Sequence, residues 1–183
     1  MPSPLGHALG GAAAAWLAGG RLPRHVHATV VVPFTGGTRS VELSRVALEA
    51  TLFATVAIVP DLDLLAGVHR TVTHSIGAVI VAGLVTVLVT RGRWPALAAG
   101  VMAAWGSHLL LDWLGADMSP PNGLMALWPF TTRYYESPLG FFDAISRRYW
   151  LPDEFIWHNL RAVTKEVLVL APIAWIASRI SRR

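Results

Sequence analysis

Five stretches of the chain are runs of predominantly apolar residues: 5–20, 46–60, 73–90, 95–111 and 167–180. The run 73–90 has eighteen residues without Lys, Arg, Asp or Glu, and as a helix it would span about 27 Å, close to the apolar core of a bilayer. The run 95–111 also lacks these charges and begins with Pro95, which suits a first helical position. The pattern predicts an all-α, membrane-embedded bundle of about five helices.

The connection before the last run, at about 115–160, has a different character. Residues 128–157 contain ten of the seventeen aromatic residues, among Pro, Gly and charged residues, so this segment cannot be a plain membrane span. Two interpretations remain open. The aromatic rings form an interfacial belt at the level of the lipid headgroups, or the segment is a lid or lipid-facing entrance. We predict a single domain over residues 1–183 that includes this loop.

Composition agrees with a membrane protein and excludes several other classes. Charged residues make up 14% of the chain, against about 25% in an ordinary soluble domain, and the mean hydropathy is +0.49. The apolar content is too high for disorder, and the basic residues are scattered, so no nucleic-acid partner is predicted. Because the chain has no cysteine, any metal must be held by His, Asp and Glu.

The few charged residues fall at the two ends of a bundle whose helices alternate in direction. One end, which includes the turn at 91–93, collects nine of the fifteen basic residues: Arg21, Arg24, Arg39, Arg45, Arg91, Arg93, Arg179, Arg182 and Arg183. The positive-inside rule places this end in the cytoplasm. We therefore predict a multi-pass membrane protein, with membrane lipids as its surroundings. The other end, predicted to be non-cytoplasmic, collects His7, Asp61, Asp63, His69, His74, His108 and Asp112.

Two of these motifs place carboxylates beside other polar groups. His108 and Asp112 are four residues apart, so on a helix they share one face and could bind a metal, or simply form a buried hydrogen-bonded pair. Asp61 and Asp63 follow Pro60, and in an extended chain both would point to the same side. An acidic turn that caps the next helix is the alternative.

The remaining motifs supply imidazoles. In HRTVTHS, His69 and His74 are separated by a non-helical spacing, so one would come from a loop and the other from the first turn of a helix. His7 lies on an otherwise apolar Gly- and Ala-rich run. Each histidine alone could be an ordinary hydrogen-bonded residue. Together, oxygen and nitrogen donors from several helices suit one or two divalent ions such as zinc, manganese or iron.

These motifs carry a resemblance to a known family. His7, PDLD at 60–63, HRTVTHS at 69–75 and SHLLLDWLG at 107–115 resemble the YdjM-like family of bacterial inner-membrane proteins, described as metal-dependent hydrolases and as LexA-binding. The resemblance covers most of the first two thirds of the chain. It implies a membrane-bound hydrolase whose metal site comprises His7, both PDLD acids, both histidines of HRTVTHS and the HxxxD pair.

More distantly, the chain resembles zinc-dependent phospholipase C and related single-strand nucleases. It lacks a matching N-terminal Trp and a second HxxxD or HxxxE motif. His158 and Glu166, eight residues apart, are candidates to replace that motif in part.

The resulting hypothesis is hydrolysis of a phosphoester or similar ester on a lipid or amphiphile by a metal-activated water. Asp63 is the candidate to orient or deprotonate that water, and Arg70 to bind negative charge on the substrate. Two alternatives remain: a metal-binding transporter, for which Glu49 is the candidate intramembrane group unless it snorkels or pairs with Arg45, and a non-enzymatic partner protein. His25 and His27 fall at the cytoplasmic end and are predicted not to be ligands.

Overall fold

The computed structural model describes residues 1–34, 37–67, 69–118 and 120–182, and these form five α-helices and one small hairpin. The helices are α1 (Pro4–Leu17), α2 (Arg45–Ile58), α3 (Ile76–Val89), α4 (Pro95–Leu114) and α5 (Pro152–Ile180). Two 3₁₀ segments, η1 (Val59–Ala66) and η2 (Val72–His74), lie between α2 and α3. The prediction of a mainly helical chain is confirmed.

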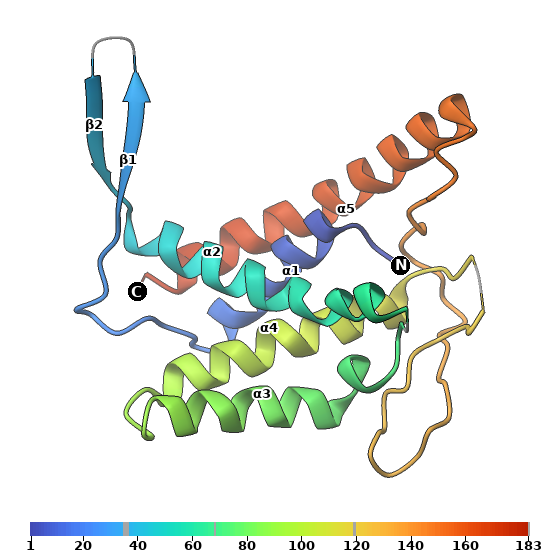
Figure 1. The fold of residues 1–183 in the computed structure, drawn as a ribbon, viewed down its shortest axis with the longest axis horizontal. Coiled ribbons are helices and arrows are strands. Elements are labelled where there is room, and N and C mark those ends of the chain that lie inside the picture. The colour runs from blue at the N-terminus through green and yellow to red at the C-terminus, as the bar shows by residue number, and fades with distance from the viewer. Residues whose placement is uncertain (35–36, 68, 119, 183) are drawn as a thin grey trace.

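The hairpin corrects the expectation of an all-α chain. Strand β1 (Thr29–Phe34) pairs antiparallel with β2 (Gly37–Glu42), in a register that runs from Thr29 opposite Glu42 to Phe34 opposite Gly37. The sequence of β1, TVVVPF, is rich in β-branched residues, which favour strands. The hairpin projects from one end of the bundle (Figure 1).

Helix α1 is the central helix, because it contacts α2, α4 and α5. Its small residues permit these close approaches. A Cβ atom on Gly11 would overlap that of Ala57 and lie 2.9 Å from the carbonyl oxygen of Phe53, while one on Gly10 would lie 2.6 Å from Leu111 Cδ1. The glycines therefore bring α1, which carries His7, against both α2 and α4.

Three serines determine where helices begin. The hydroxyl oxygens of Ser3, Ser44 and Ser75 accept hydrogen bonds from the backbone amides of Gly6, Ala47 and Ala78, as N-caps do. Ser75 is in an extended conformation, so α3 begins at Ile76 rather than at residue 73 as predicted. The apolar run 73–90 thus yields a helix of 14 residues.

Helix α5 begins fifteen residues earlier than the predicted run 167–180. Pro152 occupies the first turn together with Asp153 and Glu154, whose negative charges favour a helix N-terminus. Phe155 is consequently helical, and the aromatic-rich loop shortens to residues 115–151. Hydropathy alone missed this start because the first half of α5 is amphipathic rather than apolar.

In the described part of the chain, one helix, α4, is both long and apolar enough to cross a membrane. The N-terminal end of α1, η1, η2, the C-terminal end of α4 and the loop 115–151 lie at one end of the bundle (Figure 1). The turn between α3 and α4, the hairpin and the end of α5 lie at the other. The predicted polar residues are thereby brought to one end.

Candidate metal centre

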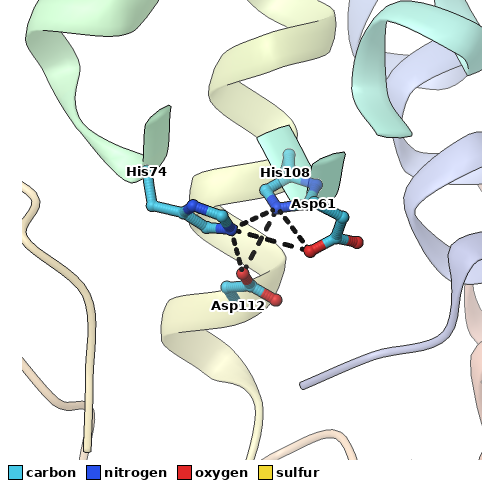
Figure 2. Close-up of side chains that lie close together, drawn as sticks. All are labelled: Asp61, His74, His108 and Asp112. Carbon is cyan, nitrogen blue, oxygen red and sulfur yellow. Dashed lines mark hydrogen bonds and ion pairs between the residues drawn. The ribbon is translucent and has the colours of Figure 1, made fainter. Parts of the chain in front are cut away.

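Four side-chain donor atoms from three segments converge at the polar end of the bundle (Figure 2). His108 and Asp112 come from α4, His74 from η2 and Asp61 from η1. His74 Nε2 lies 3.0 Å from His108 Nε2, and each of these nitrogens lies 3.3 Å from Asp112 Oδ2 and 3.7 Å from Asp61 Oδ1. Four donors, two nitrogen and two oxygen, therefore face one common point.

The spacing fits a small divalent ion. Donors held about 2.0 to 2.1 Å from a tetrahedral zinc ion are about 3.3 to 3.4 Å from one another. The five distances in which a histidine nitrogen takes part range from 3.0 to 3.7 Å, on either side of this value. Nitrogen and oxygen donors without sulfur suit zinc and also manganese or iron.

Unsatisfied buried atoms support the same fit. Both oxygens of Asp112 and Oδ1 of Asp61 are buried and have no hydrogen-bond partner among the described residues. His74 and His108 are fully buried. Buried carboxylate oxygens without partners are costly, and a cation between the four donors would satisfy them.

The outer ring nitrogens are held by partners that orient the histidines. His108 Nδ1 donates to the carbonyl oxygen of Ala57, 2.7 Å away, and His74 Nδ1 lies 3.1 Å from Asp63 Oδ2. Because a carbonyl only accepts, the Nδ1 of His108 carries the hydrogen and its Nε2 presents a lone pair to the centre. Such outer partners fix ring orientation in metal sites.

The charges around His74 alter pKa values in the 3₁₀ segments η1 and η2. Burial alone would lower the pKa of His74, but the nearby carboxylates of Asp112, Asp61 and Asp63 outweigh burial and raise it to about 10. Burial would raise the pKa of Asp63, but hydrogen bonds from His74, His69 and Thr73 lower it to about 2. In the metal-free protein, a proton on His74 thus provides the positive charge that the carboxylates require.

His7 lies beside the four donors. It is fully buried, its ring stacks on that of His108 with centroids 3.8 Å apart, and its Nε2 lies 3.3 Å from Asp112 Oδ1. Neither ring nitrogen makes a hydrogen bond to a described residue. His7 thus faces the second oxygen of Asp112, where it could act as a further ligand.

Asp63 and His69 form a second layer around His74. Asp63 Oδ1 lies 2.7 Å from His69 Nδ1, and Asp63 Oδ2 accepts from Thr73 Oγ1 at 2.8 Å. Asp63, His69 and His74 form a second group of potential metal ligands. The expectation of an extended PDLD segment is wrong: the 3₁₀ turns of η1 place Asp61 near Nε2 of His74 and Asp63 near its Nδ1.

A cavity of about 640 Å³ opens beside this cluster, with Asp61, His69 and Arg70 in its wall. The guanidinium of Arg70 is buried and pairs with Asp117 Oδ1 at 2.7 Å. It also donates to the carbonyl oxygen of Pro121 at 3.0 Å. Sequence reasoning missed Asp117, because no local spacing links it to Arg70.

Two further residues considered from the sequence lie outside both groups of potential ligands. His158 Nε2 donates to the carbonyl oxygen of Ala144 at 2.6 Å. Glu166 is fully buried and accepts hydrogen bonds from the amide of Ser3, at 2.8 Å, and from the Ser3 hydroxyl. Glu166 therefore anchors Ser3, the N-cap of α1, four residues before the fully buried His7.

The histidines predicted not to be ligands lie elsewhere. His25 packs against Trp94, and His27 pairs with Glu42 at 3.3 Å. Neither belongs to the groups that could hold a metal among the described residues.

The fold and the cluster define a mainly helical protein with buried His and Asp side chains that could hold a metal ion. The chain belongs to the YdjM inner membrane protein family, which matches it over residues 1–183. The resemblance inferred from the motifs is thus confirmed, and it extends through the last third of the chain. No curated protein and no solved structure matches the chain.

Proposed function

We propose that the protein is a membrane-bound metal-dependent hydrolase that acts on a phosphoester or ester of a lipid or amphiphile. The observation that carries this proposal is the convergence of four buried donors, with unsatisfied oxygens, at the edge of a cavity. Zinc, manganese or iron is the expected ion, and His7 and His69 would serve a further coordination position or a second ion.

The residues would have three roles, namely metal binding, positioning of His74 and attraction of the substrate. His74, His108, Asp61 and Asp112 hold the ion, which when bound lowers the pKa of a water molecule and makes it a nucleophile near neutral pH. Asp63 already accepts bonds from His69, Thr73 and His74, which favours a positioning role over the proton transfer predicted from the sequence. Arg70 stands in the cavity wall to attract negative charge on the substrate, although Asp117 partly neutralises it.

The proposed setting is the bacterial inner membrane, with several passes and the metal centre at the non-cytoplasmic end. Family membership supports the membrane. The outer faces of α3 and α5 support lipid contact, because Leu84, Leu88, Leu168 and Trp175 are all more than half exposed. Helix α3 covers only about 21 Å, so the bilayer would have to thin around it or its polar flanks would have to snorkel.

Topology can be tested by single-cysteine labelling, since the chain has no cysteine. Arg93→Cys lies in the turn between α3 and α4 and Arg133→Cys in the loop 115–151, both at exposed positions. A membrane-impermeant maleimide applied to intact spheroplasts should label position 133 and not 93. The reverse labelling would overturn the proposed orientation.

The hydrolase proposal is tested by metal content and activity together. Full-length protein purified in mild detergent should contain stoichiometric divalent metal and hydrolyse at least one member of a panel of phospholipids, simple phosphodiesters and carboxylic esters. Asp112→Ala and His74→Ala should lose both properties. Asp143→Asn, a half-exposed acid in the loop, is the control that should keep both. Metal binding that survives the first two substitutions would refute the site.

The two alternatives give different results. A non-enzymatic partner protein would be stabilised against heat by metal while the whole substrate panel stays unreactive. A transporter would move metal or protons across liposomes in a manner that Glu49→Gln abolishes. Glu49 is buried, but it pairs with Arg45 at 3.2 Å and accepts from the amide of Leu22 at 3.0 Å, an arrangement that favours a structural role.

A further inference from the structure

The loop before α5 places two adjacent arginines in the wall of the cavity that borders the metal centre. Arg147 and Arg148 line the same space of about 640 Å³ as Asp61 and His69. The Arg147 guanidinium lies 4.0 Å from Met1 Sδ, which in turn lies 2.7 Å from His69 Nε2. A single flexible side chain, that of Met1, therefore stands between Arg147 and the histidine at the edge of the centre.

The backbone that carries these arginines is firmly anchored. The amide of Ser146 donates to Asn159 Oδ1 at 2.7 Å, and Asn159 Nδ2 donates back to the carbonyl oxygen of Ser146 at 2.9 Å. Ser146 is buried, and its hydroxyl accepts from the amide of Arg148 at 3.3 Å. These bonds tie the backbone of residues 146–148 to α5, so the two arginines extend from a fixed part of the cavity wall.

Formal charges explain why a substrate anion would need these arginines. The carboxylates of Asp61 and Asp112 would cancel the charge of a divalent ion, and Asp63 adds a further negative charge. Arg70 is already paired with Asp117 at 2.7 Å. The centre and Arg70 therefore offer little net positive charge to an incoming anion.

Within the part of the chain that the structure describes, no strong ion pair neutralises the positive charge of Arg147 or Arg148. Arg147 has no carboxylate partner among the described residues, and the contact of Arg148 with Glu154, at 3.5 Å, is about half exposed, which makes it weak. Guanidinium groups bind phosphate oxygens in a bidentate manner. A neutral carboxylic ester has no charge for them to recognise.

We propose that Arg147 and Arg148 form the anion-binding side of the substrate cavity, and that the substrate is a phosphate ester whose phosphoryl group lies between these arginines and the metal centre. This inference rests on the proposed function and narrows it from esters in general to phosphate esters. The apolar part of the wall, which includes Ile58, Leu64 and Ile145, receives the adjoining carbon skeleton. The phosphate can belong to a lipid headgroup or to a soluble ester.

The test is direct binding of inorganic phosphate to the full-length, zinc-loaded protein in detergent micelles, measured by isothermal titration calorimetry at constant ionic strength. The double variant R147Q/R148Q should bind phosphate at least about tenfold more weakly than the wild type, the lower end of the loss of a charged hydrogen bond. Zinc content should not change, because neither arginine contacts the four donors. Both arginines are exposed, so the fold should tolerate the substitutions.

Arg133→Gln is the matched control. Arg133 lies in the same loop and is exposed, but it does not line the cavity, so its substitution should leave phosphate affinity within about twofold of wild type. Phosphate binding that is absent in the wild type, or equal in R147Q/R148Q and Arg133→Gln, overturns the inference. An absence of zinc binding or of all hydrolysis counts instead against the proposed function, and phosphate affinity is then compared among the same three proteins without metal.

Kinetic measurements separate the two sources of phosphate. A soluble aryl phosphate and phosphatidate in neutral vesicles are compared as substrates, and for whichever is hydrolysed, R147Q/R148Q should raise KM with little change in kcat. Hydrolysis of the vesicle lipid alone identifies a lipid headgroup, and hydrolysis of the aryl phosphate alone identifies a soluble ester. Preferential hydrolysis of a neutral carboxylic ester that R147Q/R148Q does not affect would refute the phosphate assignment.

Discussion

Replacing Asp63 with asparagine changes the support of His74 without removing any of the four converging donors. Asp63 lies 3.1 Å from His74 Nδ1 and 2.7 Å from His69 Nδ1, and accepts from Thr73 at 2.8 Å. Asparagine has one acceptor oxygen in place of two, and its amide would face a ring nitrogen. The charge-assisted hydrogen bonds to at least one histidine are therefore lost.

The expected loss of metal affinity follows from the position of Asp63 outside the four donors. Loss of a partner that orients a metal-binding histidine weakens metal affinity by about 10- to 100-fold, which corresponds to about 1.4 to 2.8 kcal/mol of binding free energy. Because the pKa of Asp63 is lowered to about 2, the carboxylate is ionised throughout the range of pH in which histidines bind metal. The loss should therefore be present at every pH from about 5 to 8.

The assay is competition for zinc between the purified protein and a chelator of known affinity. Asp63→Asn should bind one ion with reduced affinity, Asp112→Asn should lose far more because it removes a ligand, and Asp143→Asn should match the wild type. Wild-type affinity in Asp63→Asn would refute the positioning role. A variant with normal zinc affinity but greatly reduced kcat would point instead to the proton transfer predicted from the sequence.

Three further predictions address helix packing, the protonation of His74 and the anchoring of α1. Gly11→Ala should destabilise the protein by about 1 to 3 kcal/mol through overpacking against α2. Gly106→Ala places its Cβ with no described atom within 4 Å, so it should be neutral or stabilising by up to about 1 kcal/mol. Equal melting temperatures for the two variants would contradict this reasoning. Since the pKa of His74 is raised to about 10, zinc should displace a proton from His74 at pH 7. Calorimetry in buffers of different ionisation enthalpy should then detect release of about one proton per ion, and the affinity for zinc should rise with pH. Uptake of zinc without proton release would show that His74 carries no extra proton in the metal-free protein. Glu166→Gln should lower stability by about 1 to 3 kcal/mol and leave metal stoichiometry unchanged, and a lost metal equivalent would make Glu166 part of the site.

Much of the candidate site could be predicted from local sequence. The four-residue spacing of His108 and Asp112 fixes their common face on any helix, and alternation of helix direction brought the other polar motifs to the same end. The roles of the two acids in the PDLD segment were harder to predict. Its expected extended conformation gave both acids the same role, whereas the 3₁₀ turns of η1 direct Asp61 to the four donors and Asp63 to the outer nitrogen of His74.

Other features depend on contacts between distant segments. Asp117 forms an ion pair with Arg70. Asn159 forms hydrogen bonds with the backbone of Ser146, next to Arg147 and Arg148. Neither pair has a spacing that a periodic pattern could reveal. The early start of α5 was hidden for a different reason, since its first half is amphipathic and hydropathy detects only the apolar second half.

The sequence by itself determined the helical class, the end of the bundle at which the polar residues gather and the identity of most candidate ligands, because these follow from hydrophobic runs and short spacings. Tertiary structure alone decided which atoms face one another. Donor geometry depends on side-chain directions and on how closely α1, α2 and α4 approach, and these distances are set by packing at glycines such as Gly11. A difference of one turn in that packing would separate His7 from Asp112 without altering any sequence pattern.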